Sequence, residues 1–197
     1  MVKIEKLEIG ALNLKNVLRY MGMWGGEPPK ELISKIEKAE KKMLPELSGR
    51  VAYIETPVIR TGDDRIELEG IVFESKALAR HLSGCDRAVL MAATVGTGAD
   101  KLRQRAAVDS TVSELIFDAL GTEAIESLCD SFCDAYAARN GEVTPRFSPG
   151  YGDLDLAYQK DLVAVLDTNR RIALSLTDSL LMTPTKSVTA IMGIKNT

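Results

Sequence analysis

The sequence predicts an α+β protein with a mainly antiparallel, twisted sheet and flanking helices. Runs rich in β-branched residues occur along the chain without the regular strand–helix alternation that builds a parallel sheet. One long helical region separates the early strands from the late ones, and the chain closes on a helix followed by strands. We expect a single domain over residues 1–197 that includes an N-terminal helical portion, 1–48.

The composition is that of an ordinary globular protein. Of the 197 residues, 45% are hydrophobic and 27% are charged. The net charge of -3 leaves no basic surplus to neutralise phosphates, so we expect no nucleic-acid partner. No apolar run is long enough to cross a bilayer, and the first residues lack the apolar core of a signal peptide, so we expect no membrane partner. Three cysteines fit a reducing compartment and predict a cytoplasmic protein.

The first half of the chain is predicted to contain two helices and a hairpin. Asn13 caps a short helix over 13–21, and a longer amphipathic helix covers 30–44. Two β-branched runs, 51–60 and 65–74, flank a polar turn and predict a β-hairpin.

The middle of the chain shows several helix starts around one buried strand. Ser75 caps a short helix, and 87–95 is an apolar strand. Two Thr-x-x-acid patterns, 97–100 and 111–114, have the form of capping boxes, and the second opens a helical region that reaches about Arg139. After residue 155 the pattern predicts one helix and three strands, which cover 156–166, 171–176, 179–182 and 187–194.

Acidic residues recur along the long helical region at positions 114, 118, 126, 130 and 134. A row with a spacing of four winds around a helix, because four residues advance about 400°. Most of the row should therefore face solvent, while one member could point into a site.

Patterns for self-sufficient catalysis are absent from the sequence. His81 is the only histidine, so we predict neither a catalytic triad nor a metal site. Cys129 and Cys133 share a helix face, but no second ligand pair follows, and we interpret them as small buried hydrophobes. Gly96 and Gly98 lack the third glycine of a dinucleotide loop.

Residues 146–153, Arg-Phe-Ser-Pro-Gly-Tyr-Gly-Asp, gather groups suited to a ligand. Arginine offers a rigid fork for a carboxylate or phosphate. The Pro-Gly pair fixes a turn that brings backbone close to a bound molecule. Taken alone this is a turn with a basic residue, so its neighbours decide the interpretation.

Three ordered segments resemble the activation (reactivation) domain of vitamin B12-dependent methionine synthase. Arg146-x-x-Pro149-Gly150-Tyr151 is similar to that family's Arg-x-x-Pro-Gly-Tyr core. Residues 176–188, with Leu-Thr-Asp-Ser, Met-x-Pro and Ser-Val, resemble a Leu-Thr-Glu-Ser…Met-x-Pro…Ser-Val run. Residues 119–126 resemble the helix that carries an acidic ligand contact. The resemblance covers about residues 109–190.

The resemblance implies a C-shaped domain that binds S-adenosylmethionine in a shallow groove. It implies that Arg146 pairs with the ligand carboxylate and that Glu126 accepts from a ribose hydroxyl or the ammonium group. Backbone at Ser148 and Gly150 would meet the adenine, with Tyr151 packed beside it. In that family the domain offers the methyl donor to oxidised cobalamin, while flavodoxin or another low-potential reductant supplies electrons.

This chain carries no recognisable cobalamin domain, so the resemblance places cobalamin on a partner, a separate methionine synthase or related corrinoid methyltransferase. Two other functions stay open. A non-catalytic docking or chaperone module for a corrinoid protein is favoured by the lack of the family's Asp-Trp-Thr-Pro-Phe-Phe segment. A binder of some other small molecule in the same groove is the third.

Overall fold

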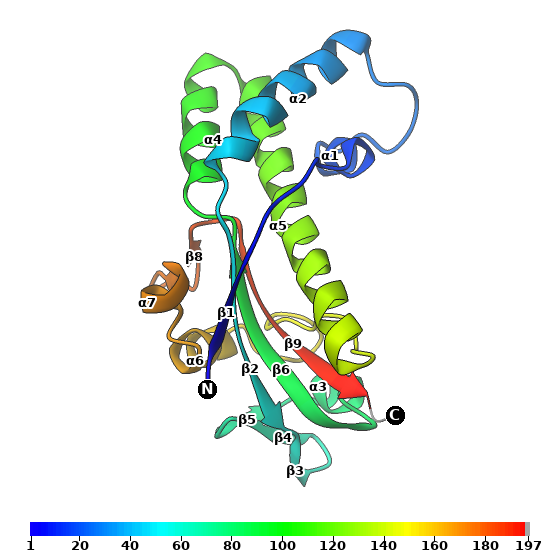
Figure 1. The fold of residues 1–197 in the computed structure, drawn as a ribbon, viewed down its shortest axis with the longest axis vertical. Helices are drawn as coiled ribbons and strands as arrows, with labels where there is room; N and C mark the ends of the chain where they lie inside the picture. The colour runs from blue at the N-terminus through cyan, green and yellow to red at the C-terminus, as the bar shows by residue number, and fades with distance from the viewer. Residues whose placement is uncertain (196–197) are drawn as a thin grey trace.

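A four-stranded antiparallel sheet forms the centre of the protein (Figure 1). The computed structural model describes residues 1–195. The strand order is β1-β2-β6-β9, and all neighbours run antiparallel. The strands are β1 Lys3–Leu7, β2 Gly49–Pro57, β6 Cys85–Thr94 and β9 Ser187–Lys195. The predicted α+β class with a mainly antiparallel sheet is confirmed.

Both faces of the sheet are buried, each in a core of its own. Along β2, Val51 and Tyr53 belong to one core and Ala52 and Ile54 to the other, as the alternation of a strand requires. The first core receives helices α1 Leu14–Tyr20, α2 Lys30–Met43, α4 Gly98–Asp109 and α5 Thr111–Asn140. A single turn of 3-10 helix, η1 Leu44–Glu46, follows α2.

The second core is covered by short elements. They are α3 Lys76–His81, α6 Tyr158–Val165, α7 Thr168–Ile172 and the small strands described below. Because both faces of the sheet are covered, a central strand can be apolar at almost every position, and β6 is buried from Ala88 to Thr94. The predicted buried strand over 87–95 is thereby confirmed.

The prediction that 51–60 and 65–74 pair as one hairpin is wrong in its pairing. β2 pairs with β1 and β6, whereas β3 Ile59–Gly62 pairs with β4 Arg65–Leu68. The chain then turns back into β5 Ile71–Glu74. Glu69 and Gly70 both have positive φ, 51° and 79°, which is the geometry of a tight two-residue hairpin turn. The run 65–74 is therefore two strands.

The late region also differs from its prediction. Residues 168–172 form α7, and only β7 Ser175–Leu176 remains of the strand expected over 171–176. The Thr168 hydroxyl donates to the carbonyl of Leu174 at 2.7 Å, which closes this helical turn. β7 pairs with β8 Met182–Thr183, which is shorter and later than the expected strand over 179–182. The helix and the last strand, α6 and β9, occur where the pattern predicts them.

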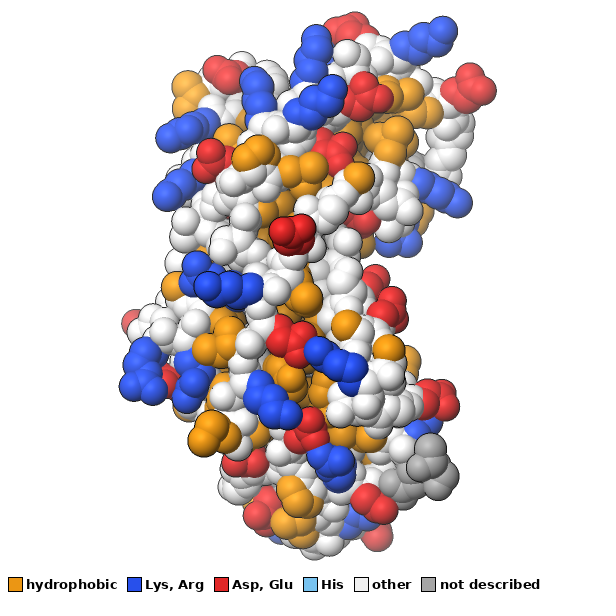
Figure 2. Space-filling view, viewed as in Figure 1, with side chains coloured by type: hydrophobic (Ala, Val, Ile, Leu, Met, Phe, Trp, Pro, Cys, Tyr) orange, Lys and Arg blue, Asp and Glu red, His pale blue; other side chains and the backbone are white. Residues whose placement is uncertain are grey.

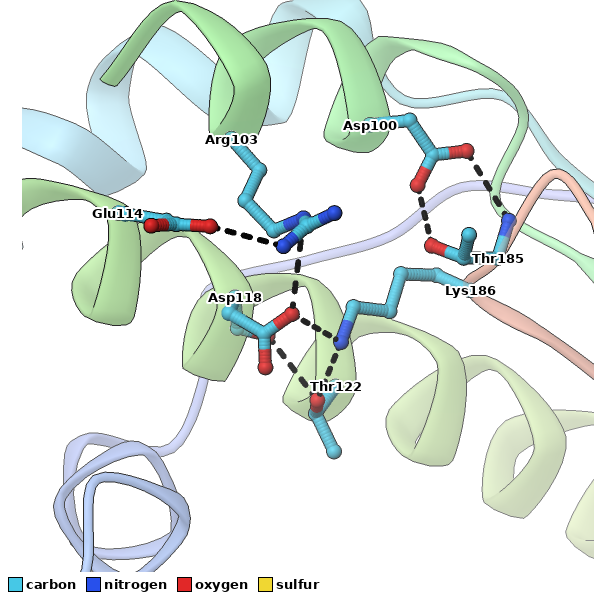
Figure 3. A network of polar contacts seen from close by, with 7 residues as sticks. All are labelled: Asp100, Arg103, Glu114, Asp118, Thr122, Thr185 and Lys186. Atoms are coloured by element: carbon cyan, nitrogen blue, oxygen red, sulfur yellow. Dashed lines mark hydrogen bonds and ion pairs between the residues drawn. The ribbon is translucent and has the colours of Figure 1, made fainter. Parts of the chain in front are cut away.

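The two Thr-x-x-acid patterns start helices but do not act as capping boxes. Thr97 makes no side-chain cap bond, and the N-cap of α5 is Ser110, whose hydroxyl accepts from Ser113 N at 3.1 Å. The acidic side chains are used in tertiary contacts instead (Figure 3). Asp100 accepts from Thr185 N at 3.0 Å, and Glu114 pairs with Arg103 at 2.9 Å.

Lys186 fastens the start of β9 to α5. Its Nζ lies 2.9 Å from Asp118 Oδ1 and 2.9 Å from Thr122 Oγ1 (Figure 3). Gly121 leaves room for this lysine, since a Cβ there would lie 3.1 Å from Lys186 Cγ. Helix α5 itself runs unbroken through 30 residues, and its predicted apolar face is buried: Ile125, Leu128, Cys129, Phe132 and Tyr136.

One face of the protein carries charges of both signs. Figure 2 shows an elongated molecule whose Lys and Arg side chains are interspersed with Asp and Glu over this face. Within residues 1–195, no helix combines the length and the apolar character that a membrane span needs.

Candidate functional site

The chain after α5 runs along the free edge of β9. Thr144 N donates to Gly193 O at 2.9 Å, and Lys195 N donates to Glu142 O at 2.9 Å. Phe147 and Ile191 exchange two backbone hydrogen bonds, of 2.9 and 2.8 Å. Because this pairing fixes Phe147 to β9, it also fixes the position of the preceding residue. That residue, Arg146, faces α5.

The far end of the 146–153 stretch is anchored to α3. The Asp153 carboxylate accepts from the Ser75 hydroxyl and from the backbone N–H groups of Lys76, at 2.9 Å, and Ala77, at 3.1 Å. The Ser75 hydrogen bond and these N–H groups lower the pKa of Asp153. Asp153 thus ties the 146–153 stretch to the start of α3, which packs in the second core.

His81 braces the same stretch from α3. Its Nε2 lies 2.8 Å from Pro145 O and 2.8 Å from Thr144 Oγ1, and its ring lies over Phe147 with centroids 5.0 Å apart. Burial lowers the pKa of His81, against a smaller opposing effect of the hydrogen bond to Pro145. His81 thus has a structural role: its Nε2 contacts the 144–145 segment, and its ring packs on Phe147.

The predicted Pro-Gly turn is present. Gly150 has φ +93° and donates from its N–H to Leu154 O at 2.8 Å, while Tyr151 N donates to Ser148 O at 3.1 Å. Gly152 also has positive φ and lies against α3, where a Cβ would come within 2.9 Å of Ala77 Cβ. The turn leaves the Tyr151 side chain 60% exposed and edge-on to Phe147.

A groove of about 680 Å³ lies between α5 and the 142–151 segment. Its lining comes from three elements: Glu126, Asp130 and Cys133 of α5; Glu142, Val143, Thr144, Pro145, Arg146, Ser148 and Tyr151; and Val188 and Lys195 of β9. Of the residues singled out in the sequence, Glu126, Arg146, Ser148 and Tyr151 meet here. Gly150 does not line the groove and serves the turn behind it.

Arg146 joins the 142–151 segment to α5 through three side-chain contacts. It donates to Glu126 Oε2 at 2.7 Å and to Asp130 Oδ1 at 2.7 Å, and its third contact is Cys133 Sγ at 3.9 Å. Glu126 and Asp130 are four apart on α5, so they share a face and can grip one guanidinium together. Two members of the acidic row thus point into the site.

The cysteines beside Arg146 are not activated. Burial raises the pKa of Cys129 to about 12, so it behaves as a small buried hydrophobe, as predicted. Burial also raises the pKa of Cys133, against the effect of Arg146, although this thiol is half-buried and lines the groove. Over residues 1–195, no group of three or more His, Cys, Asp or Glu side chains is arranged to hold a metal ion.

Glu142, Thr144 and Lys195 are groove residues that the sequence did not single out. The pairing of 142–147 with β9 brings the first two close to Lys195, although Lys195 lies about 50 positions away in the chain. Asp130 could have been predicted as a groove residue, because it follows Glu126 by one helical turn in the acidic row.

The groove belongs to a fold that is known from another protein. No protein-family model matches the sequence, and no curated protein matches it significantly. Among solved structures, the chain is similar to a crystal structure of the MetH reactivation domain bound to AdoHcy. The TM-score is 0.71 and the identity 17%, over 98% of this chain and 78% of that one. This protein therefore has the fold of the MetH reactivation domain, as its three matching segments implied.

Proposed function

We propose that this protein binds S-adenosylmethionine in the groove beside Arg146 and supports the reductive methylation of cobalamin on a separate protein. One observation carries the proposal. Glu126, Arg146, Ser148 and Tyr151, chosen from the sequence, line one groove in a fold whose solved relative holds AdoHcy. The groove volume, about 680 Å³, falls in the range of small-molecule sites.

The groove residues offer contacts for each part of the ligand. Arg146 has five N–H donors, of which its three contacts use three, so the rest can meet the carboxylate of the methionine moiety. Glu126 has a second oxygen for the ammonium group or a ribose hydroxyl. The exposed Tyr151 ring can pack on the adenine. Ser148 lines the groove, whereas Gly150 lies outside the lining and its amide is already bonded to Leu154 O.

Bound S-adenosylmethionine would supply an electrophilic methyl group, while this chain holds and orients it. Cobalamin would reside on the partner, a B12-dependent methionine synthase or a related corrinoid methyltransferase. Flavodoxin or another low-potential reductant would provide the electron. The three free cysteines fit a reducing cytoplasm as the place of this reaction.

A reactivation assay tests this function. The partner methyltransferase, converted to its cob(II)alamin form, is mixed with S-adenosylmethionine and titanium(III) citrate as the reductant. We expect this protein to accelerate the formation of methylcobalamin, followed by its absorption spectrum. An unchanged rate with and without the protein contradicts the proposal.

A second candidate is a docking module that has lost its ligand, and one observation favours it. The guanidinium of Arg146 already bonds two carboxylates of its own chain, Glu126 and Asp130, in the place where a ligand carboxylate would pair. For a docking module, recovery of the corrinoid partner in a pull-down is independent of S-adenosylmethionine. For the first candidate, the recovered amount changes when the ligand is added.

A further inference from the structure

The charges that line the groove do not balance. The lining contains three carboxylates, Glu126, Asp130 and Glu142, and two cations, Arg146 and Lys195. Each cation is already paired within the groove: Arg146 with the two acids of α5, and Lys195 with Glu142. One negative charge is therefore left over at the groove wall.

The accessible part of this surface is more negative than the count alone indicates. The Arg146 side chain is only 19% exposed, whereas Glu126 is 40%, Asp130 is 70% and Glu142 is 72% exposed. The arginine is thus the least exposed charged group of the groove, and Asp130 and Glu142 are the most exposed. Lys195, at 47%, is the more exposed of the two cations of the lining.

We infer, resting on the proposed function, that the groove selects the positively charged methyl donor over its neutral demethylated product. At neutral pH, S-adenosylmethionine carries ammonium, carboxylate and sulfonium groups, for a net charge of +1. S-adenosylhomocysteine has lost the sulfonium charge and is neutral overall. Asp130 and Glu142 are the residues that determine this specificity, because they are the most exposed carboxylates and are not needed to contact the ligand.

The size of the preference follows from Coulomb's law. We consider one charge pair about 8 Å apart at a protein surface, where the dielectric is intermediate and salt is present. Its interaction changes the dissociation constant by roughly five- to tenfold. A groove with this preference holds the methyl donor and releases the product, since the favourable charge leaves with the methyl group.

Calorimetric titration of the full chain with three ligands tests the inference. The ligands are S-adenosylmethionine, S-adenosylhomocysteine and sinefungin, which has an amine in place of the methylsulfonium. We expect both cationic ligands to bind about five- to tenfold more tightly than S-adenosylhomocysteine at 50 mM salt, and the difference to shrink at 500 mM salt.

Charge-neutralising variants identify the residues responsible. In Glu142→Gln and Asp130→Asn, the preference should fall by at least half, mainly through weaker binding of the cationic ligands. Asp134→Asn is the matched control, because this exposed acid lies one helical turn beyond Asp130 and does not line the groove. Circular dichroism of each variant confirms that it is folded.

The possible outcomes separate the inference from the function on which it rests. If none of the three ligands binds, the proposed function itself fails. If all three bind equally, or if the preference survives in both groove variants, charge selection is overturned while ligand binding stands. A loss of preference in Asp134→Asn as large as in Asp130→Asn also overturns the assignment.

Discussion

Arg146 has a structural role in addition to the role in ligand binding that we propose for it. Its bonds to Glu126 and Asp130 hold the 142–153 segment against α5, and they fix the plane of the guanidinium. A lysine could supply the charge but not the fork, so Arg146→Lys is not a conservative change here. The same pairs that orient the arginine also set the negative balance of the groove.

His81 gives the protein a pH dependence that can be assigned to one residue. Burial lowers the pKa of His81 in the folded state, so the unfolded chain takes up the proton first as the pH falls through about 6.5. Its contribution to stability is therefore present above this pH and is lost below it. We expect the free energy of unfolding to fall between pH 7.5 and 5.5, measured by urea denaturation.

The variant His81→Gln removes this titration, and no other histidine can replace it. Its free energy of unfolding should be lower than that of the wild type at pH 7.5 and should change less down to pH 5.5. Most carboxylates titrate below this window. An equal slope in the variant and the wild type would exclude His81 as the source.

At the scale of elements, a close contact between β1, β2 and α5 depends on Gly49. A Cβ at this position would lie 2.5 Å from Leu7 O and 2.8 Å from Leu128 Cδ1. Because one of these atoms belongs to backbone, Gly49→Ala should lower the free energy of unfolding by about 1–3 kcal/mol. In the control Gly10→Ala, with nothing within 4 Å of the added Cβ, the change should stay within about 0.5 kcal/mol.

The polar network of Figure 3 is a second test at this scale. Lys186, whose side chain is 15% exposed, bonds Asp118 and Thr122 and connects the β8–β9 loop to α5. Lys186→Met keeps the length of the side chain but leaves Asp118 with only its longer contact to Arg103, 3.9 Å. We expect a loss of about 1–3 kcal/mol in chemical denaturation. The exposed Lys101→Met should cost much less, and equal losses would contradict the role of the network.

Elements with a strong local pattern could be predicted from the sequence, and elements decided by tertiary contacts could not. The apolar stripes of α2 and α5 and the continuous apolar run of β6 are local signals that survive in the structure. The split of 65–74 into β4 and β5 depends on positive φ at both Glu69 and Gly70; the glycine was a local signal for a turn, whereas Glu69 is a residue that rarely adopts this conformation. Ile172 points into the second core from a five-residue helix, too short for periodicity to identify.

The same limit applies to the groove. Arg146, Ser148 and Tyr151 could be chosen because they lie in one short motif, and Glu126 because it lies on a matching helix. Glu142 and Lys195 became groove residues only through the register of 142–147 on β9. A contact between such distant positions cannot be predicted from the spacing of neighbouring residues in the sequence.

At the scale of the whole molecule, both layers that flank the central sheet contribute to the groove. The first core and α5 supply the acidic wall of the groove, while the second core anchors the 146–153 stretch through α3. The groove lies at the β9 edge, where the two layers meet. The shared fold at 17% identity therefore rests on the arrangement of these layers, while most side chains differ.

The proposed binding of S-adenosylmethionine in this groove through Arg146 is tested most directly by a calorimetric titration. We expect a dissociation constant in the micromolar range for the wild type and for the control Arg139→Ala, because Arg139 pairs with Glu5 of β1 and does not line the groove. Arg146→Ala should bind at least tenfold more weakly, because it loses a charge-assisted contact to the ligand carboxylate. Wild-type protein that gives no binding heat, even with the corrinoid partner present, would contradict the account.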